Sequence, residues 1–549
     1  MQRLTGLVKL NFIALAILLM ANILTGVANA SEDRCSITLP SSLVLKDSSF
    51  TPVNMSFTPV LRLGREYLGT LVRYDADANL VPSLAKSWEI APDNRSITFQ
   101  LDRTCHWSDG APITANQFKA GFETLFDPST SFTANGGFAP LSELIKGANA
   151  VRNKQVSPKM IGLRALDEAT FVVETEGPAD LFLQALTSHN YTPLPTHWIN
   201  AGKMKWPAPE IWQVASGPYV VQKVDPKMVA MGRNPHFCKG QEKPLKAVRY
   251  LLDSPRQATI GMFLNGAIDG VDRFSQRIVA PLLKNVDQIR KFKFTAPGGS
   301  PDRVYSYLFV NQTVPELQDP RIKQAISLLI EYEFLASGPI MGTETHILDG
   351  FLLPVEGYRS PALEYRTTPY TERVEKARVL MEEAGYSEKN RLRLDLPLRE
   401  NHEFFSLGQA IAGMLSKGHF DVQTRLAGEG EEYYRNLDTR NFGVGLFLWG
   451  TILPDPSIVL RGVIDKRITS QDVHDGYHDL YNQSLQQDTR DDRFARLLEL
   501  EKQLQANGHI IPLTAVTRTF ILGEEYKLTG GVFLQAANLE PADTKACAP

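Results

Sequence analysis

The run SITFQL at Ser96–Leu101, followed by WSDGAPITA at Trp107–Ala115, combines a strand-like pattern with a turn and the start of a helix. Polar and apolar side chains alternate along the first run, as they do in a half-buried β-strand. The dipeptide Asp109-Gly110 favours a tight turn, and Thr114 is suited to cap a helix that begins near Asn116. This stretch therefore predicts a strand, a turn and a helix in close succession.

Outward from this stretch, short β-like runs and amphipathic helical segments alternate along the chain without a fixed repeat. The segment from Arg373 to Ala384, for example, carries apolar residues on a helical period and ends at Gly385, a residue that favours helix C-caps. Neither half of the chain is all-helical or all-β, which is typical of an α/β protein. We expect helices over residues 116–125, 319–331 and 373–384, and strands over residues 96–101, 170–175, 219–223 and 444–449.

Length and composition set broad limits on the class of protein. The chain has 549 residues, of which 43% are hydrophobic and 22% charged. This composition is ordinary for a soluble globular protein and argues against fibrous and low-complexity classes. At roughly 100 to 200 residues per domain, the length predicts about three domains, or one large domain with lobes.

The first thirty residues predict a signal peptide for export. Arg3 and Lys9 precede an apolar stretch from about Phe12 to Leu24, and the small residues Ala28-Asn29-Ala30 favour cleavage after Ala30. The apolar stretch is about 13 residues long, short of the roughly 20 that span a bilayer, which favours a cleaved signal over a permanent anchor. Because the first cysteine is Cys35, we do not expect a lipid-anchored N-terminus.

The mature chain is then expected to begin at Ser31. Cleavage removes two basic residues and no acidic one, so the formal net charge changes from −3 to −5. A negative charge argues against nucleic acid as a partner, because binding phosphates needs a basic surface.

The four cysteines, Cys35, Cys105, Cys238 and Cys547, would enter an oxidising compartment after export. They permit two disulfides, or one disulfide with two free thiols, and pairing all four allows three connectivities that the sequence does not separate. Their spacings are too wide for a CxxC metal or redox motif.

A series of short motifs continues in register from the opening stretch to the C-terminal part of the chain. It begins with LVPSLAKSWE at Leu80–Glu89 and passes through the strand, turn and helix described above. The later members are Gly217–Tyr219, Arg233–Pro235, Tyr307–Asn311, Asp319–Ala325, Glu375–Arg378, Glu383–Tyr386, Trp449, Asp455-Pro456 and Ile510–Leu513. Taken in order, these motifs resemble family 5 of the extracellular solute-binding proteins, which contains the oligopeptide- and dipeptide-binding proteins of ABC importers. The resemblance covers essentially the whole mature chain and is closest to the periplasmic oligopeptide-binding branch.

The resemblance implies an α/β fold of the two-lobed periplasmic binding protein type (type II, cluster C), with an extra inserted domain and a hinge between the lobes. By motif order, lobe I would take residues 31–69, 196–300 and 513–549, the extra domain residues 70–195, and lobe II residues 301–512. It also implies a monomer in the periplasm that closes over a peptide or peptide-like ligand and delivers it to the ABC permease subunits in the inner membrane. A hinge motion of this kind is driven by better contacts in the closed state than in the open one.

The resemblance also places a candidate ligand site at the end of a strand. In peptide-binding relatives an aspartate three residues after a tryptophan holds the α-ammonium group of the ligand. Here the sequence runs Trp449, Gly450, Thr451, Ile452, so the acid is missing. A buried ammonium group without an anionic partner costs several kcal/mol. A peptide N-terminus held in the usual way is therefore not expected, unless the loop brings Asp455 to the site.

The same resemblance assigns Tyr433, Arg440 and His402 to an aromatic wall, a basic group and a side chain near the far end of the ligand. Tyr433 and Trp449 would offer broad apolar faces, and Arg440 could bind a carboxylate or phosphate through two hydrogen bonds. Each has a structural alternative. Trp449 could belong to the core, His402 could lie on the surface, and Arg440 could pair with a neighbouring acid. Leu446 stands where relatives carry a second basic residue, which predicts a less charged cleft.

Motifs for catalysis, cofactors and metals are not found in the sequence. His402-Glu403 lacks the second histidine of a zinc protease helix, and Gly298–Asp302 lacks the spacing of a nucleophile elbow. Asp75–Asn79 resembles the opening of a calcium loop, but Leu80 stands in place of the turn glycine and Lys86 in place of the closing glutamate. We interpret this segment as a polar hairpin turn and expect no catalytic residues, cofactor or metal.

Two other functions remain open from the sequence. The first is a sensor or scaffold of the same fold that signals to a partner instead of delivering a ligand. The second is a periplasmic hydrolase with an unrecognised site. Specialisation away from peptides toward another solute is a variant of the transport hypothesis.

Overall fold

A computed structural model provides the structure of the chain. It describes residues 35–41, 43, 58–75, 77–128, 141, 143–204, 213–238, 245–255, 258–272, 292–295, 303–337, 345–400, 402–428, 431–451, 453, 455–465, 471–517, 520–529, 536–543 and 547. The expected signal peptide and its cleavage site lie outside these residues. Among the helices within these ranges, none is both long and apolar enough to cross a bilayer.

The first lobe is built from both ends of the chain and from its middle. Its main sheet has the order β1-β10-β9-β8, in which β1 runs parallel to β10 although more than 200 residues separate them in sequence. A second sheet has the order β11-β19-β12. Ile37, Tyr219, Val248 and Phe520 belong to one buried cluster, so the early, middle and late segments share a core. The elements are β1 (Ser36–Pro40), α2 (Thr58–Tyr67), β8 (Tyr219–Asp225), β9 (Met228–Arg233), β10 (Ala247–Leu251), α8 (Thr259–Leu264), β11 (Gly270–Asp272), β12 (Phe292–Thr295), β19 (Phe520–Gly523), β20 (Tyr526–Leu528), η7 (Ala536–Asn538) and β21 (Leu539–Pro541).

The extra domain is an antiparallel sheet of order β4-β5-β7-β6 packed against helices. Phe118 and Phe122 of α3 contact Phe171 of the sheet, with ring centroids 6.0 and 5.4 Å apart. Thr114 is the N-cap of α3, and its backbone N–H donates to the side chain of Gln117 at 2.9 Å. The elements are β2 (Val72–Tyr74), β3 (Leu80–Pro82), β4 (Ala85–Ile90), β5 (Ser96–Leu101), α3 (Ala115–Phe126), α5 (Ala148–Arg152), η2 (Pro158–Met160), β6 (Leu163–Ala165), β7 (Thr170–Glu174), α6 (Ala179–Ala185) and α7 (Thr196–Asn200).

The second lobe has a sheet of order β14-β18-β13-β17 and a parallel pair, β15 and β16. Side chains of β13 alternate between two cores. Tyr305, Tyr307 and Phe309 pack with residues of α15, α16 and α17, whereas Leu308 and Val310 pack with residues of α10, α12 and α13. The elements are β13 (Arg303–Val310), η4 (Pro315–Gln318), α10 (Pro320–Leu328), α11 (Tyr332–Leu335), β14 (Thr345–Ile347), η5 (Glu364–Thr367), α12 (Tyr370–Glu383), β15 (Leu392–Leu398), α13 (His402–Leu415), η6 (Ser416–Gly418), β16 (Phe420–Leu426), α14 (Glu431–Asp438), β17 (Val444–Thr451), α15 (Pro456–Ile464), α16 (Gln471–Leu485), α17 (Arg490–Asn507) and β18 (Ile510–Thr517).

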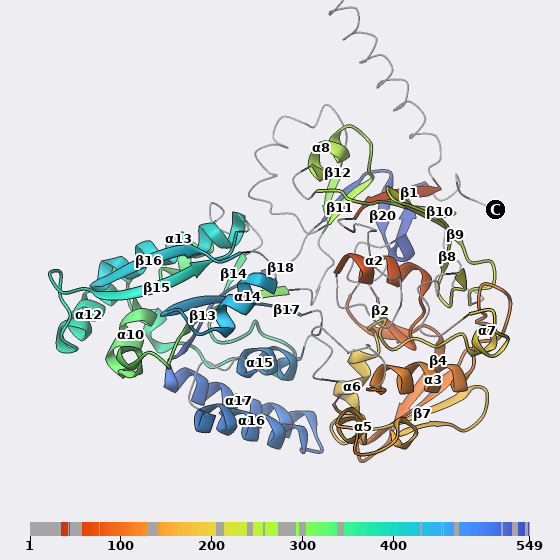
Figure 1. Cartoon of the computed structure of the whole chain (residues 1–549), viewed down its shortest axis with the longest axis horizontal. Helices are drawn as coiled ribbons and strands as arrows, with labels where there is room; N and C mark the ends of the chain where they lie inside the picture. The colour runs from red at the N-terminus through yellow and green to blue at the C-terminus, as the bar shows by residue number, and fades with distance from the viewer. Residues whose placement is uncertain are drawn as a thin grey trace, which may run out of the picture.

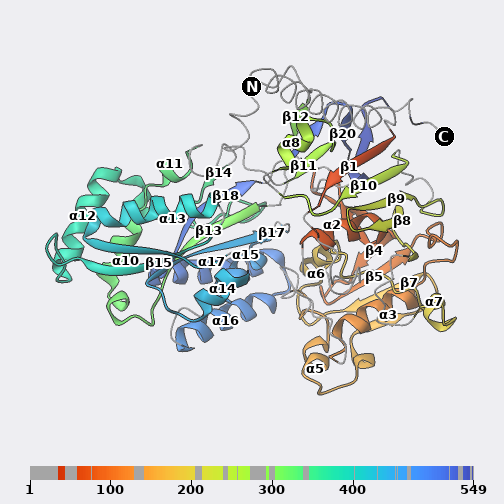
Figure 2. The same ribbon diagram turned by 45° about the horizontal axis from the view of Figure 1, so that its top comes forward.

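These three units form a two-lobed α/β molecule (Figures 1 and 2). In both views the second lobe lies to one side, and the first lobe and the extra domain lie together on the other. Two of the boundaries expected from the sequence fall elsewhere in the structure. The boundary at residue 512 lies inside β18, which pairs with β13 as far as Thr517. The segment after residue 195 packs with the extra domain, because Trp198 and Met204 contact its core.

Two disulfides resolve the three connectivities that the sequence left open. Cys35 is bonded to Cys547, and Cys105 is bonded to Cys238. No cysteine is free. The first bond joins the two ends of the first lobe, and the second joins the extra domain to the first lobe. Of the alternatives that the sequence allowed, the structure has two disulfides.

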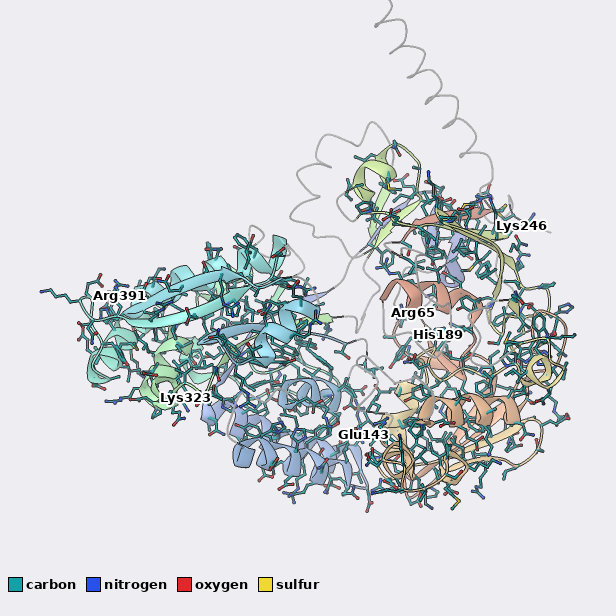
Figure 3. All side chains as sticks on the ribbon, in the orientation of Figure 1. Arg65, Glu143, His189, Lys246, Lys323 and Arg391 are labelled. Carbon is teal, nitrogen blue, oxygen red and sulfur yellow. A yellow bond between two sulfur atoms is a disulfide. The ribbon has the colours of Figure 1, made fainter. Side chains whose placement is uncertain are left out.

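The second lobe also contacts the extra domain directly. Leu453 and Ile458, which flank the start of α15, are buried in the core of the extra domain. Arg493 of α17 has no exposed side-chain surface and binds both oxygens of Asp180 in α6 at 3.1 Å. Glu143, at the edge of the extra domain (Figure 3), lies 3.8 Å from the guanidinium group of Arg461.

His509, just before β18, is a buried titratable group that couples stability to pH. It is 2% exposed, and its Nε2 atom lies 3.4 Å from the hydroxyl of Tyr477. Burial, with a smaller contribution from the charge of Lys323, lowers the pKa of His509 to about 3. Protonation therefore favours the unfolded chain, in which the pKa is about 6.5. The stability that neutral His509 provides is complete above pH 6.5 and is lost as the pH falls toward 3.

We expect the wild-type protein to lose about 2 kcal/mol of unfolding free energy through His509 alone between pH 7 and pH 5. His509→Gln should reduce the loss of stability over this range by that amount, as measured by urea unfolding at the two pH values. His346→Gln, at an exposed position, is the matched control and should leave the pH dependence unchanged. Equal pH dependence in wild type and His509→Gln would contradict the prediction.

Candidate functional site

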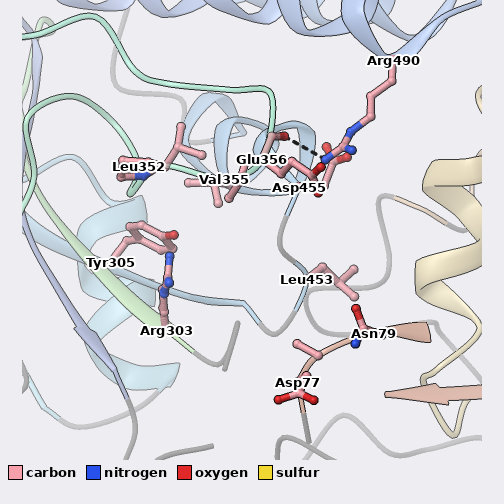
Figure 4. A pocket seen from close by; sticks show the side chains of 13 residues that line it. Asp77, Asn79, Arg303, Tyr305, Leu352, Val355, Glu356, Leu453, Asp455 and Arg490 are labelled. Carbon is pink, nitrogen blue, oxygen red and sulfur yellow. Dashed lines mark hydrogen bonds between the residues drawn. The ribbon is translucent and has the colours of Figure 1, made fainter. Parts of the chain in front are cut away.

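A cavity of about 290 Å³ lies between the second lobe and the β2–β3 hairpin of the extra domain (Figure 4). Its volume is close to the lower end of the range for small-molecule sites, about 300 to 1,000 Å³. It is lined by Asp77, Ala78, Asn79, Arg303, Tyr305, Leu352, Pro354, Val355, Glu356, Leu453, Asp455, Val459 and Arg490.

The wall formed by the second lobe follows from strand register. Arg303 and Tyr305 begin β13 and are two residues apart, so their side chains lie on the same face of the sheet. In the neighbouring strand β17, Thr451 is the partner of Arg303 and Trp449 is the partner of Tyr305. Tyr305 is 3% exposed, and burial raises the pKa of its hydroxyl group. Figure 4 shows Arg303 and Tyr305 together on this wall.

The facing wall is a tight hairpin of polar residues. β2 and β3 pair antiparallel, and the carboxylate of Asp75 accepts hydrogen bonds from the backbone N–H groups of Asp77 and Asn79, both at 2.9 Å. Ala78 has a φ of 65°, a left-handed conformation that the turn requires. Burial raises the pKa of Asp75, but the hydrogen bonds from Asn79 and Asp77 outweigh it and lower the pKa overall. The interpretation of this segment as a hairpin turn is confirmed.

Asp455 lines the cavity near α15, and both oxygens of its carboxylate already have partners within the protein. It is 2% exposed, and its carboxylate caps α15 by accepting from the N–H of Ser457 at 2.8 Å. Its other oxygen lies 3.3 Å from Arg493. Asp455 therefore keeps the loop position suggested by its Asp-Pro motif, and the negative charge needed for a ligand ammonium group is taken up by Arg493.

The charges of the cavity are mixed. Asp77, Glu356 and Arg490 are exposed at its rim. Arg490 donates to the backbone oxygen of Glu356 at 3.0 Å and stacks on the ring of Phe494 at 4.9 Å. No group of three or more His, Cys, Asp or Glu side chains suited to a metal ion occurs in the described ranges.

Of the residues predicted for the ligand site at the end of β17, those that the structure describes are not among the residues that line the cavity, and their environments differ. Trp449 is partly buried against the core that includes α15, stacks on Phe447 at 6.4 Å, and would clash with any side chain at Gly462. Gly450 is exposed. Thr451 is 6% exposed and its Oγ1 accepts from the N–H of Leu453 at 3.0 Å. Ile452 lies outside the described residues.

Tyr433 and Arg440, two further predicted site residues, do not line this cavity. Tyr433 is 1% exposed, and its hydroxyl donates to the backbone oxygen of Leu446 at 2.8 Å. Arg440 is exposed and precedes Val444, which marks the end of β17 opposite to Thr451. His402 begins α13, but its side chain lies outside the described part of the chain. Ligand contact stays a prediction for these residues.

Sequence reasoning missed most of the cavity lining. The motif at Tyr307–Asn311 overlaps the end of β13, and following the two-residue alternation of that strand backward leads to Tyr305 and Arg303. No comparable signal exists for the hairpin residues Asp77 and Asn79, because their approach to the second lobe depends on how the extra domain packs.

Comparison with known families gives one match that covers most of the chain. Residues 79–471 match the model described as "Bacterial extracellular solute-binding proteins, family 5 Middle". This range begins at the β2–β3 hairpin and ends at α16, so it includes most of the residues that line the cavity.

Individual proteins with similar sequences or structures carry related names. The periplasmic oligopeptide-binding protein of Haemophilus influenzae is 26% identical over 412 residues, which is 72% of each chain. A probable deoxycholate-binding periplasmic protein of Escherichia coli is 27% identical over 331 residues, 59% of each chain. Among solved structures, the murein tripeptide binding protein of Escherichia coli superposes with a TM-score of 0.75 at 22% identity, covering 92% of this chain and 98% of that one. The last comparison shows a shared fold.

Proposed function

The chain belongs to family 5 of the bacterial extracellular solute-binding proteins, and from this premise we propose that it binds a peptide or peptide-like compound for an ABC importer. The ligand would bind in the cavity between the second lobe and the extra domain and be delivered to the permease subunits in the inner membrane. The observation that carries this proposal is the cavity itself, whose walls come from two different units of the fold. A ligand that contacts both walls stabilises one relative position of the two units, which a permease could recognise.

The proposed location is the periplasm. The relatives compared above carry periplasmic names, and residues 1–30 have the pattern of a signal peptide that is cleaved after Ala30. The two disulfides support an oxidising compartment. The mature protein would act as a monomer that carries its ligand unchanged, without catalysis and without binding nucleic acid.

The ligand would lack the usual free α-amine anchor. Ile452 stands where peptide-binding relatives place an aspartate, and the nearby Asp455 is engaged by Arg493 and Ser457. Of the carboxylates that remain, Asp77 and Glu356 are exposed at the rim, where water screens their attraction for an ammonium group. A compound with a blocked or absent α-amine would therefore lose less on binding than an ordinary peptide.

A second candidate function is the import of a non-peptide solute. The relative named as a probable deoxycholate-binding protein favours this alternative, because its sequence is as similar to the chain as that of the oligopeptide-binding protein. A sensor that signals to a separate partner would use the same cavity.

The test is native mass spectrometry of the mature protein purified from the periplasm, followed by release and identification of the bound compound. We expect one defined compound, peptide-like and without a free α-amine. A mixed population of peptides with free N-termini would contradict the conclusion drawn from Ile452, and a bound non-peptide would favour the second candidate. Chemical conversion of the compound during incubation would contradict the carrier role.

A further inference from the structure

Arg303 lines the cavity and has no carboxylate partner among the residues that the structure describes. It begins β13 and contributes its side chain to the cavity beside Tyr305 (Figure 4). In the part of the chain that the structure describes, no acidic side chain lies within ion-pair distance of its guanidinium group, and its buried Nε has no hydrogen-bond acceptor.

Two other arginines near the cavity are held in place by the chain itself. Arg493 is buried between Asp180 and Asp455. Arg490 is bound to the backbone oxygen of Glu356 and stacked on Phe494. An arginine has five N–H donors in a planar fork, and buried donors of this kind are normally satisfied. The buried Nε of Arg303 has no acceptor among the described residues, and its guanidinium group faces the cavity without an ion-pair partner there, so it is open to a partner that is not part of the chain.

The position of Arg303 in the sheet holds it in place for such a partner. β13 is bonded to β17 on one side and to β18 on the other, so the backbone of Arg303 is fixed between Thr451 and Thr517. Tyr305, two residues along the same strand, is almost fully buried and lines the cavity beside Arg303. A preorganised guanidinium group binds a planar carboxylate through two parallel hydrogen bonds.

We propose that Arg303 binds a carboxylate group of the ligand and thereby selects acidic ligands in this cavity. The assignment rests on the proposed function, since it takes the cavity as the ligand site. It gives to Arg303 the role that the sequence suggested for Arg440, which lies beyond the opposite end of β17. The carboxylate could be the C-terminus of a peptide or an acidic side chain.

The experiment compares the wild type with Arg303→Met and measures which ligands each protein retains by native mass spectrometry. Three mixtures of synthetic tripeptides serve as probes: one with free C-terminal carboxylates, the same peptides as C-terminal amides, and amides that each contain one glutamate. We expect the wild type to prefer a carboxylate-bearing mixture over the plain amides, and Arg303→Met to bind that mixture roughly ten- to a hundredfold more weakly. Preference for the first or the third mixture identifies which carboxylate is bound.

Two further variants keep the result interpretable. Arg496→Met removes an arginine from the exposed side of α17, where it pairs with Glu499 at 3.0 Å, and should leave the preference for acidic peptides intact. Arg303→Lys keeps the charge but loses the fork, so it should bind acidic peptides with intermediate affinity. It replaces Arg303→Met if that variant does not fold, as judged by circular dichroism.

Failure of the inference and failure of the proposed function give different results. If the wild type binds acids and amides equally well, Arg303 has no such role although the protein remains a peptide binder. If the wild type retains no peptide, the peptide function fails. The compound that copurifies then decides the role of Arg303. An acidic compound that Arg303→Met no longer retains supports the inference, and any other outcome overturns it.

Discussion

Replacing Arg493 with alanine is expected to lower the free energy of unfolding by about 3 to 5 kcal/mol, because it leaves buried carboxylates without their cation. The side chain of Arg493 has no exposed surface, and Asp455, one of its two partners, is 2% exposed. Burial alone would raise the pKa of Asp180, but the hydrogen bonds and charge of Arg493 outweigh it and lower the pKa. The loss can be measured by urea unfolding followed by circular dichroism.

The matched control for this prediction is Arg496→Ala, three residues along the same helix. Arg496 pairs with Glu499 on the surface, where both side chains are about half exposed, and such pairs contribute at most about 1 kcal/mol. Asp180→Asn should cost less than Arg493→Ala, since Asp180 is 30% exposed. If Arg493→Ala and Arg496→Ala unfold at the same urea concentration, the ion pairs do not connect the second lobe to the extra domain as argued.

Removing the disulfide between Cys105 and Cys238 is expected to lower the free energy of unfolding by about 2 to 5 kcal/mol. This bond closes a loop of 133 residues, so in its absence the unfolded chain gains conformational entropy. Both cysteines are buried in the core of the extra domain. The double variant Cys105→Ser, Cys238→Ser should therefore unfold at a lower urea concentration than the wild type under oxidising conditions.

The second disulfide gives a quantitative comparison. Cys35 and Cys547 are 512 residues apart, and loop-closure entropy grows only with the logarithm of loop length. The variant Cys35→Ser, Cys547→Ser should thus lose only about 1 kcal/mol more than the other pair. In the presence of a reductant that breaks both bonds, wild type and variants should become alike. A persistent difference would mean that the serine substitutions disturb packing.

Much of the secondary structure could be predicted from local patterns. The strand expected over residues 96–101 is β5, and the helix expected over residues 116–125 lies within α3. The segment expected as one helix over residues 319–331 is instead α10, which ends at Leu328, followed by the separate short helix α11. Asp319 caps α10 as an acidic N-cap residue does. An N-cap residue can be recognised from the local sequence. A break within a stretch of helical pattern, such as the one between α10 and α11, is harder to recognise.

The candidate site was harder to predict because it depends on long-range pairing. The cavity wall requires Arg303 to lie beside Thr451, almost 150 residues later, and no local pattern encodes that register. Tyr433 looked suitable for an aromatic wall, yet it fills the core and bonds to Leu446. The resemblance to a family pointed to the end of β17, where ligand contact stays a prediction, and the residues that line the cavity followed only from the three-dimensional arrangement.

The bond between Cys35 and Cys547 also bears on the order in which the protein is assembled. The extra domain and the second lobe are each one continuous stretch of chain, complete before β19 is synthesised. The first lobe is different, since β19 lies between β11 and β12 and the hydroxyl of Tyr526 donates to the backbone oxygen of Ser36. Domains that are continuous in sequence can fold as they emerge. The lobe that contains β1 is therefore the last to be completed, because its early segments pack against segments that are synthesised last.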